Sequence, residues 1–226
     1  VVAVSQFTKN IIIEKYGVPE EKITVVHNGV EEKNFIGVVG VPEFVRQLKK
    51  NGKKIVLFVG RITLQKGPDY FVNIAKRVSE YMDNVYFVVS GSGDMEGKMI
   101  EDAARSGIAE KFIFTGFLRG DELDSVYRSA DMYIMPSVSE PFGIAPLEAV
   151  QQGVPTLISR QSGVSEVLSH ALKADFWDID DMADKVLSIL QNDVLKFTLS
   201  RQGNKEVKNI DWKKAAQKCI LLYSKL

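Results

Sequence analysis

Short uninterrupted apolar runs recur along the chain, separated by segments in which apolar residues return every three or four positions. The runs lie at residues 54–59, 84–90, 111–114, 132–135 and 154–158. Runs of this length without alternation are typical of strands buried on both faces of a parallel sheet, and the intervening spacing is helical. The pattern predicts an α/β fold, a doubly wound Rossmann-like parallel sheet.

Capping residues and prolines mark where several helices begin. Ser5 and Asp178 stand just before helical segments, and Pro68 opens another. A short polar side chain there accepts a hydrogen bond from the first turn, and proline loses nothing because its N–H would be unpaired. The expected helices lie at 6–16, 68–80, 121–130, 144–153, 178–190, 194–207 and from 211 onward, with a short helix that begins at Pro42 and ends at 51–52 and another that follows Asp94.

Composition narrows the functional classes. The 226 residues include 29 lysines and arginines, 29 aspartates and glutamates, and 45% hydrophobic residues. This balance gives no general attraction to nucleic acid, and no apolar run is long enough to predict a membrane span. The single cysteine, Cys219, fits a reducing compartment, and His27 and His170 lack the cysteine partners of a zinc site. We expect a cytoplasmic protein without nucleic-acid or metal partners, and leave peripheral contact with a membrane open.

The most informative stretch follows the apolar run 132–135. The segment 140–143 has loop composition, and a helix is expected to begin near Ile144. In open α/β sheets, ligands bind where a loop leaves the carboxyl end of a strand and feeds a helix. The N–H groups of Phe142, Gly143 and Ile144 would be unpaired there, and together with the helix dipole they favour an anion or a hydroxyl.

Two carboxylates bracket this loop. Glu140 stands just before it, and Glu148 lies about one turn into the helix. Ionised carboxylates repel phosphate, so we assign both to hydroxyl groups, from which they would accept hydrogen bonds. Either glutamate alone has an ordinary interpretation as a solvated charge, but the whole string favours a binding site.

A basic loop follows the strand at 54–59. Arg61 and Lys66 lie between Gly60 and Gly67, and both side chains can reach a diphosphate. Arginine offers a planar fork of donors and lysine a compact point charge. The alternative is that both are solvated surface charges. The order of strand, glycine-flanked loop and helix favours a binding loop instead. It lacks the glycine-lysine-threonine ending of a P-loop.

The string EPFGIAPLE at 140–148 resembles the signature of the retaining glycosyltransferases of family 4, which have the two-domain GT-B fold. The resemblance covers almost the whole chain. It implies that Glu140 lies by the donor sugar and that Glu148 accepts hydrogen bonds from ribose hydroxyls. It also implies that the N–H groups after Phe142 hold the sugar or the diphosphate.

The resemblance extends to three other loops. Segment 60–67 is similar to the family's glycine-arginine and lysine-glycine loop, whose arginine and lysine grip the donor phosphates. Gly91 and Ser92 match a glycine-rich turn that lines the donor cleft. Phe117 and Leu118 stand where relatives hold the nucleotide base against main-chain groups. For the Phe117 side chain, a place in the core is an equal alternative.

The resemblance also predicts the domain organisation. In relatives, a serine-containing strand, a helix and an asparagine-glycine-valine turn close an amino-terminal acceptor domain, and Ser5 and segment 28–30 are similar to these. Residues 1–34 are therefore expected to be the remnant of that domain and the hinge, and residues 35–226 the nucleotide-sugar donor-binding domain. A complete protein with an edge strand–helix unit is the alternative. Without the first domain, part of the last helix should be exposed.

These features predict a hexosyltransferase-type enzyme of carbohydrate biosynthesis that moves a sugar, with retention, from a nucleoside diphosphate sugar to a hydroxyl acceptor. Arg61, Lys66 and the helix start at Gly143 would stabilise the departing diphosphate without a metal or cofactor. Glu140 would orient the sugar, and the donor phosphate would take the acceptor's proton, as is proposed for the family. A nucleotide-sugar binding module inactive without its partner domain, and another GT-B chemistry such as epimerisation or phosphorolysis, are alternatives.

Overall fold

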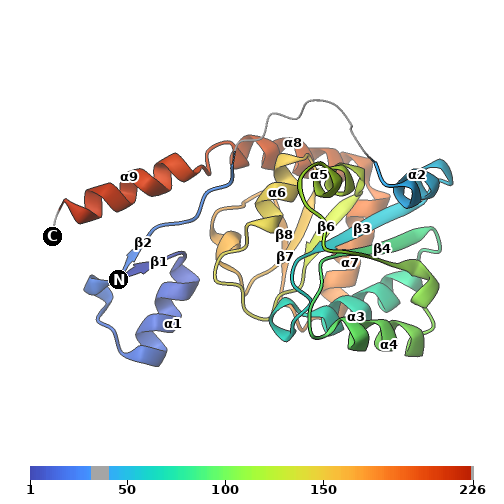
Figure 1. Cartoon of the computed structure of the whole chain (residues 1–226), viewed down its shortest axis with the longest axis horizontal. Helices are drawn as coiled ribbons and strands as arrows, with labels where there is room; N and C mark the ends of the chain where they lie inside the picture. The colour runs from blue at the N-terminus through green and yellow to red at the C-terminus, as the bar shows by residue number, and fades with distance from the viewer. Residues whose placement is uncertain (32–40, 225–226) are drawn as a thin grey trace.

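The computed structural model describes residues 1–31 and 41–224. Residues 1–31, hereafter the N-terminal segment, carry a small parallel sheet of β1 (Val2–Ala3) and β2 (Thr24–Val25) around helix α1 (Gln6–Tyr16). The remainder forms a larger α/β unit, and the last helix, α9 (Trp212–Tyr223), returns from it to lie beside the N-terminal segment (Figure 1). Residues 32–34, where the predicted domain boundary lies, fall outside the described residues.

The larger unit is built on a six-stranded sheet in the order β5-β4-β3-β6-β7-β8, in which all neighbours are parallel. Successive connections run outward from β3 in one direction and then, from β6, in the other, so a topological switch point lies between β3 and β6. The strands are β3 (Lys54–Val59), β4 (Val85–Ser90), β5 (Phe112–Gly116), β6 (Met132–Met135), β7 (Thr156–Ser159) and β8 (Leu172–Ala174).

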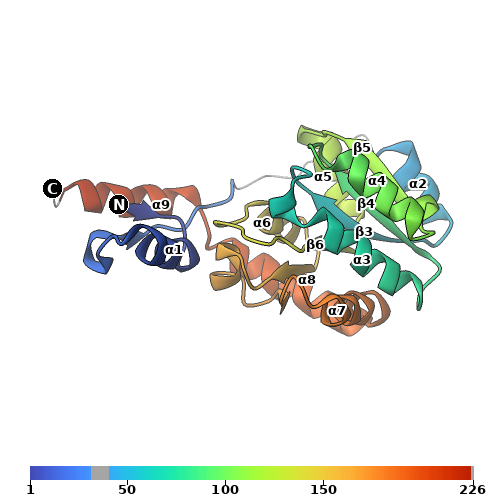
Figure 2. The same cartoon turned by 90° about the horizontal axis from the view of Figure 1, so that it is seen from below.

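Helices cover both faces of this sheet (Figure 2). They are α2 (Glu43–Lys50), α3 (Pro68–Ser79), α4 (Glu96–Arg105), α5 (Gly120–Ser129), α6 (Ala145–Gln151), α7 (Ile179–Gln191) and α8 (Asp193–Val207). Short 3-10 turns are η1 (Glu20–Lys22) in the N-terminal segment and η2 (Leu64–Lys66), η3 (Ala109–Lys111) and η4 (Gly163–Glu166) in the larger unit. The expected caps are present: Ser5 accepts from the Thr8 N–H and Asp178 from the Asp181 N–H, each at 3.0 Å.

Strand β3 shows why its apolar run does not alternate. Val56 and Phe58 pack into a core with α3, α4 and α7, whereas Ile55 and Leu57 pack into a second core with α2, α5 and α6. A strand covered on both faces needs apolar residues at every position. The predicted doubly wound α/β fold is therefore confirmed.

Several predicted boundaries were wrong. Strand β5 continues through Gly116, two positions beyond the expected end of the run. Helix α6 begins at Ala145, beside the expected start near Ile144, but ends at Gln151, two positions before Gly153. The short edge strand β8 was not predicted, because it has only three positions, two of them half-buried and one of them a lysine. The Phe117 side chain is 65% exposed, which excludes the core alternative.

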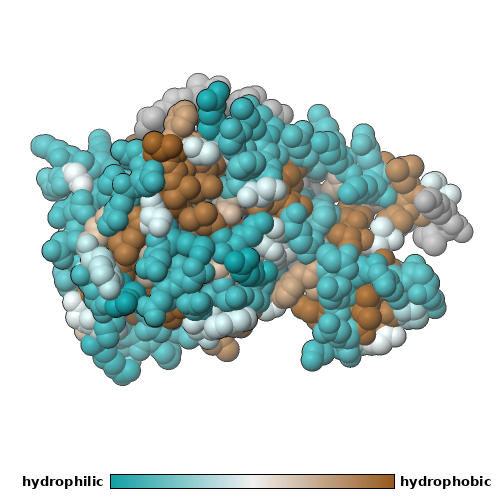
Figure 3. Space-filling view, turned by 180° about the vertical axis from the view of Figure 1, so that it is seen from behind, coloured by the Kyte–Doolittle hydropathy of each residue, from teal (hydrophilic) through white to brown (hydrophobic). Residues whose placement is uncertain are grey.

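Helix α9 buries little of its own surface. Trp212, Ile220, Leu221 and Tyr223 are exposed, whereas only Ala215 is buried among the residues described in this helix. Figure 3 shows apolar surface at this end of the molecule. The expectation of an exposed apolar face on the last helix agrees with this arrangement.

Candidate functional site

The loops that follow β3 and β6 are joined at the switch point. The Val138 N–H donates to the Gln65 carbonyl oxygen at 2.9 Å, and the Gln65 side-chain amide donates to the Ser139 carbonyl oxygen at 2.8 Å. Gly67 adopts a φ of +67°, and a Cβ there would lie 2.2 Å from the carbonyl oxygen of Pro136. Only glycine permits this contact, so the two loops form one rigid edge.

Lys66 and Glu140, one from each loop, form an ion pair. Glu140 is only 7% exposed, and its main chain is fixed on both sides: its N–H donates to Gln161 and its carbonyl accepts from Gly163, each at 3.0 Å. A carboxylate so deeply buried is costly unless a cation neutralises it. Lys66 supplies that cation from the neighbouring loop.

A hollow of about 480 Å³ opens over this pair, and we call it the Glu140 hollow. Its lining combines Lys66 and Glu140 with the turn at Phe142, Gly143 and Ile144. No residue in the described part of the chain accepts a hydrogen bond from the N–H groups of Gly143 or Ile144. Both groups remain available to a ligand, although α6 is too short to add a large dipole.

The N-terminal segment also contributes to the Glu140 hollow. Val4 and Asn28 line it together with residues of the loops that follow β3 and β6. Neither residue was predicted as part of the site. Sequence reasoning had no signal for them, because they reach the hollow only through packing against the Glu140 loop, which lies more than 100 positions away in the sequence.

A second hollow of about 210 Å³, the Arg61 hollow, lies at the carboxyl ends of β3 and β4. It brings together six predicted residues and is otherwise lined by apolar side chains and Ser90. The six are Gly60, Arg61, Gly91, Ser92, Phe117 and Leu118. Arg61 is exposed, and the Arg119 guanidinium lies 4.7 Å from the Phe117 ring centre.

The glycines of the Arg61 hollow allow the loops that follow β3 and β4 to approach each other closely. Gly60 and Gly91 have φ angles of +151° and +142°, and a Cβ on Gly91 would lie 1.9 Å from the Gly60 carbonyl oxygen. A Cβ on Gly93 would lie 2.1 Å from the carbonyl oxygen of Ile62. Packing between these loops therefore requires glycine at positions 91 and 93, whereas a Cβ on Gly97 would meet no atom within 4 Å.

The structure therefore divides the predicted cationic cluster between two adjoining hollows. Lys66 shares the Glu140 hollow with the Gly143 turn, whereas Arg61 lines the other hollow. Gly60 joins them, since its Cβ position lies 3.7 Å from Lys66 Cε. An extended ligand with a charged centre can contact both hollows.

Glu148 lines neither hollow. Its carboxylate accepts a hydrogen bond from the Tyr127 hydroxyl at 3.2 Å. Burial and the nearby charges of Tyr133 and Glu148 raise the pKa of Tyr127 well above its usual value, so this hydroxyl remains a donor. The half-buried Glu148 keeps further lone pairs for a second donor.

No three His, Cys, Asp or Glu side chains within residues 1–31 and 41–224 come together in a way that could hold a metal ion. Across the same ranges, no helix combines the length and apolarity needed to cross a membrane.

Two family models and many curated proteins match this sequence. The model described as "Glycosyl transferases group 1" matches residues 41–208, and "Glycosyltransferase Family 4" matches residues 1–34. An uncharacterized glycosyltransferase of Methanocaldococcus jannaschii is 31% identical over 99% of this chain and 59% of its own length. Mannosylfructose-phosphate synthase of Agrobacterium fabrum is 27% identical over 98% of this chain and 52% of its own length. The chain spans a little over half the length of these relatives.

Solved structures share the architecture. Anabaena Alr3699/HepE in complex with UDP and glucose matches with a TM-score of 0.83 and 18% identity, over 100% of this chain and 63% of that chain. A glycosyltransferase from Rickettsia africae ESF-5 matches with a TM-score of 0.81 and 21% identity, over 100% of this chain and 62% of that chain. At such identities these likenesses establish the fold alone, and they confirm the predicted GT-B type of Rossmann-like domain.

Proposed function

The chain belongs to the group 1 glycosyl transferases, and from that membership we propose that it binds a nucleoside diphosphate sugar and supplies the donor side of a sugar transfer to a hydroxyl acceptor. The observation that carries the proposal is the pair of adjoining hollows at the switch point, joined through the loop that holds Gly60, Arg61 and Lys66. This is where ligands bind in doubly wound sheets.

In this proposal the ligand lies across both hollows. The nucleoside occupies the Arg61 hollow, which is mainly apolar and ends at the exposed Phe117 ring. The sugar occupies the Glu140 hollow, and the diphosphate lies between them within reach of Arg61 and Lys66. Guanidinium and ammonium groups both bind phosphate oxygens by charge-assisted hydrogen bonds.

In this proposal the ligand replaces Glu140 as the partner of Lys66 when it binds. A bound diphosphate competes with Glu140 for the Lys66 ammonium, and the carboxylate is then free to accept hydrogen bonds from sugar hydroxyls. As the anomeric carbon–oxygen bond breaks, negative charge gathers on the leaving diphosphate, where Lys66, Arg61 and the N–H groups at Gly143 stabilise it. We propose transfer with retention, in which the leaving phosphate accepts the acceptor's proton.

Two comparisons support this choice of donor. The solved relative Alr3699/HepE is described in complex with UDP and glucose, and the curated relative from Agrobacterium is named a synthase of a mannosyl sugar phosphate. The separate match of residues 1–34 to a second family model supports the proposal that this segment belongs to an acceptor-binding domain. We therefore expect the present chain to bind nucleotide but to form no transfer product alone.

Calorimetry with uridine, adenosine and guanosine diphosphates tests the proposal. We expect binding of at least one, with an affinity lowered about 10- to 100-fold by Arg61→Ala and by Lys66→Ala, because each removes a charged hydrogen bond to phosphate. Arg105→Ala is the matched control, since Arg105 is exposed and its ion-pair partners among the described residues, Glu101 and Asp102, belong to its own helix. Unchanged affinity in the Arg61 and Lys66 variants would contradict the assignment.

A further inference from the structure

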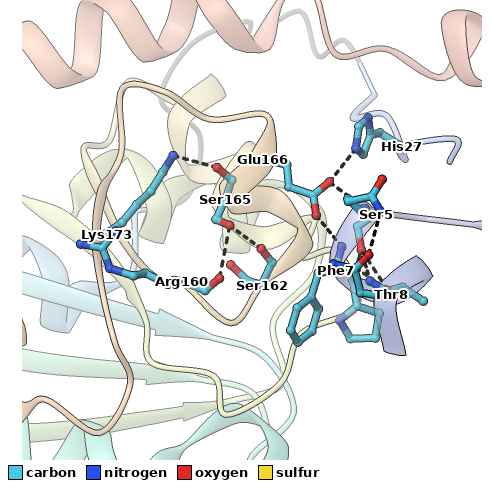
Figure 4. Close-up of polar contacts among 12 residues, drawn as sticks. Ser5, Phe7, Thr8, His27, Arg160, Ser162, Ser165, Glu166 and Lys173 are labelled. Carbon is cyan, nitrogen blue, oxygen red and sulfur yellow. Dashed lines mark hydrogen bonds and ion pairs between the residues drawn. The ribbon is translucent and has the colours of Figure 1, made fainter. Parts of the chain in front are cut away.

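One carboxylate makes three of the contacts that join the N-terminal segment to the larger unit. Glu166, at the end of η4, accepts the N–H groups of Gln6 and Phe7 at 2.8 and 2.7 Å, and its Oε2 lies 3.0 Å from Nε2 of His27 (Figure 4). Gln6 and Phe7 are the first two residues of α1, so their N–H groups have no acceptor within the helix. Glu166 satisfies both and places negative charge at the positive end of the helix dipole.

A second contact joins the same segment to the loop that carries Glu140. The Ser5 hydroxyl donates to the carbonyl oxygen of Pro141 at 2.6 Å, and the Thr8 hydroxyl approaches the same oxygen at 3.1 Å. Ser5 is fully buried, and a Cβ on Gly163 would lie 2.4 Å from Ser5 Cβ. The start of α1 is therefore seated in a notch between the Glu140 loop and η4.

These contacts set the position of one wall of the Glu140 hollow. Val4 immediately precedes Ser5, and Asn28 immediately follows His27, so both wall residues adjoin residues held by the contacts. Movement of the N-terminal segment away from Glu166 would withdraw Val4 and Asn28 and leave the hollow open on that side. The Arg61 hollow includes no residue of this segment and would be unaffected.

We propose that Glu166 and Ser5 are positioning residues that clamp the N-terminal segment against the donor loop, and so complete the part of the site that receives the sugar. The inference rests on the proposed function, because it assigns the sugar to the Glu140 hollow. It requires that loss of the clamp weaken the sugar's contribution to binding and leave nucleoside diphosphate binding almost unchanged.

The molecule contains a matched control for Glu166. Glu206, on α8, likewise accepts two consecutive backbone N–H groups, those of Ser169 and His170 at 2.9 and 3.1 Å, and lies 3.3 Å from the His170 ring nitrogen. The two carboxylates are similarly exposed, 24% for Glu166 and 20% for Glu206. Glu206 lines neither hollow, so it shares the chemistry of Glu166 but not its position.

The test compares the unchanged chain with Glu166→Gln and Glu206→Gln. Amide hydrogen exchange reports the contact itself. Calorimetry is done with uridine, adenosine and guanosine diphosphates and with their glucose conjugates. The ratio of the affinity for a conjugate to the affinity for its diphosphate is the gain in affinity due to the sugar. We expect Glu166→Gln to lose protection at Gln6 and Phe7 and to reduce the gain due to the sugar about tenfold, as for loss of one charged hydrogen bond. Glu206→Gln should lose protection at its own two amides and keep that gain.

The possible results distinguish failure of the clamp from failure of the proposed function. Binding of no probe by the unchanged chain would contradict the proposed function and this inference with it. Diphosphate binding with a gain from the sugar that Glu166→Gln leaves intact, or wild-type protection at Gln6 and Phe7 in that variant, contradicts the inference alone. If melting shows Glu166→Gln to be unfolded, Ser5→Ala decides, because it removes the shorter of the two hydrogen bonds to the Pro141 carbonyl oxygen and is expected to reduce the same gain.

Discussion

Two buried carboxylates stand at opposite ends of strand β6 and differ in how they are satisfied. Asp131 precedes the strand and Glu140 follows it, and each is 7% exposed. Asp131 pairs with Lys49 and with Lys196, the latter at 2.6 Å, and accepts the Ile55 N–H at 2.8 Å. Glu140 pairs with one lysine and opens onto a hollow.

The difference distinguishes a carboxylate held by three partners within the fold from a carboxylate that lines an open hollow. Burial would raise the pKa of Asp131, but hydrogen bonds from Lys196 and Lys49 prevail and lower it. Its two lysines come from α8 and α2, so this carboxylate holds two helices to the start of β6. At the other end of β6, Lys66 is the one lysine that pairs with Glu140 in the described part of the chain, and both line the open hollow where we propose that a ligand exchanges with the pair.

The largest expected effect comes from separating the two loops that hold the Lys66–Glu140 pair. Gly67→Ala would place a methyl group 2.2 Å from the Pro136 carbonyl oxygen at a φ of +67°. We expect it to lower the free energy of unfolding by about 2–5 kcal/mol and to abolish nucleotide binding, because the loops must move apart. Urea unfolding and calorimetry measure the two effects.

Gly52→Ala is the control for backbone conformation. Gly52 has the same φ of +67°, but a Cβ there would meet no atom within 4 Å. It should cost only about 1–2 kcal/mol for the left-handed conformation and leave nucleotide binding unchanged. Equal losses in the two variants would show that the contact between the loops contributes nothing.

The fold and the loops of the site could be predicted from sequence because their signals are local. The apolar run at 54–59 predicts the strand in which it lies, and the glycines around Arg61 and Lys66 predict the loop that directly follows that strand. The Lys66–Glu140 pair was not predicted, since its members stand 74 positions apart and meet only through the order of the strands. The division of Arg61 from Lys66 depends on side-chain directions within one loop, which periodicity does not encode.

The next prediction exchanges charge for amide at each end of β6. Asp131→Asn should lower the free energy of unfolding by about 2–4 kcal/mol, because two lysines lose their partner, and should leave nucleotide-sugar affinity unchanged. Glu140→Gln should cost about 1 kcal/mol or less, since Lys66 can turn toward solvent, but should remove the gain in affinity due to the sugar. Urea unfolding and calorimetry on both variants provide the comparison.

The comparison fails if the two variants behave alike. A large loss of stability in Glu140→Gln without a binding defect would make Glu140 a second structural carboxylate. Lys185→Ala offers a baseline, because Lys185 pairs with Asp181 on the surface of α7 and should change stability by less than about 0.5 kcal/mol.

The smallest expected effect is the acid dependence of the Asp131 end. Because the folded-state pKa of Asp131 is below its unfolded value of about 3.9, the carboxylate stabilises the fold fully above that value, and the contribution disappears as pH falls through the folded pKa. The difference in free energy of unfolding between the unchanged chain and Asp131→Asn should therefore be constant from about pH 7 to pH 5 and shrink below about pH 4. Glu206 also has a lowered pKa, since hydrogen bonds from Ser169 and His170 outweigh its burial, but it is present in both proteins and cancels in the difference. A difference that grows on acidification would mean that Asp131 is better satisfied when protonated, and the two ends of β6 would no longer differ in the way described.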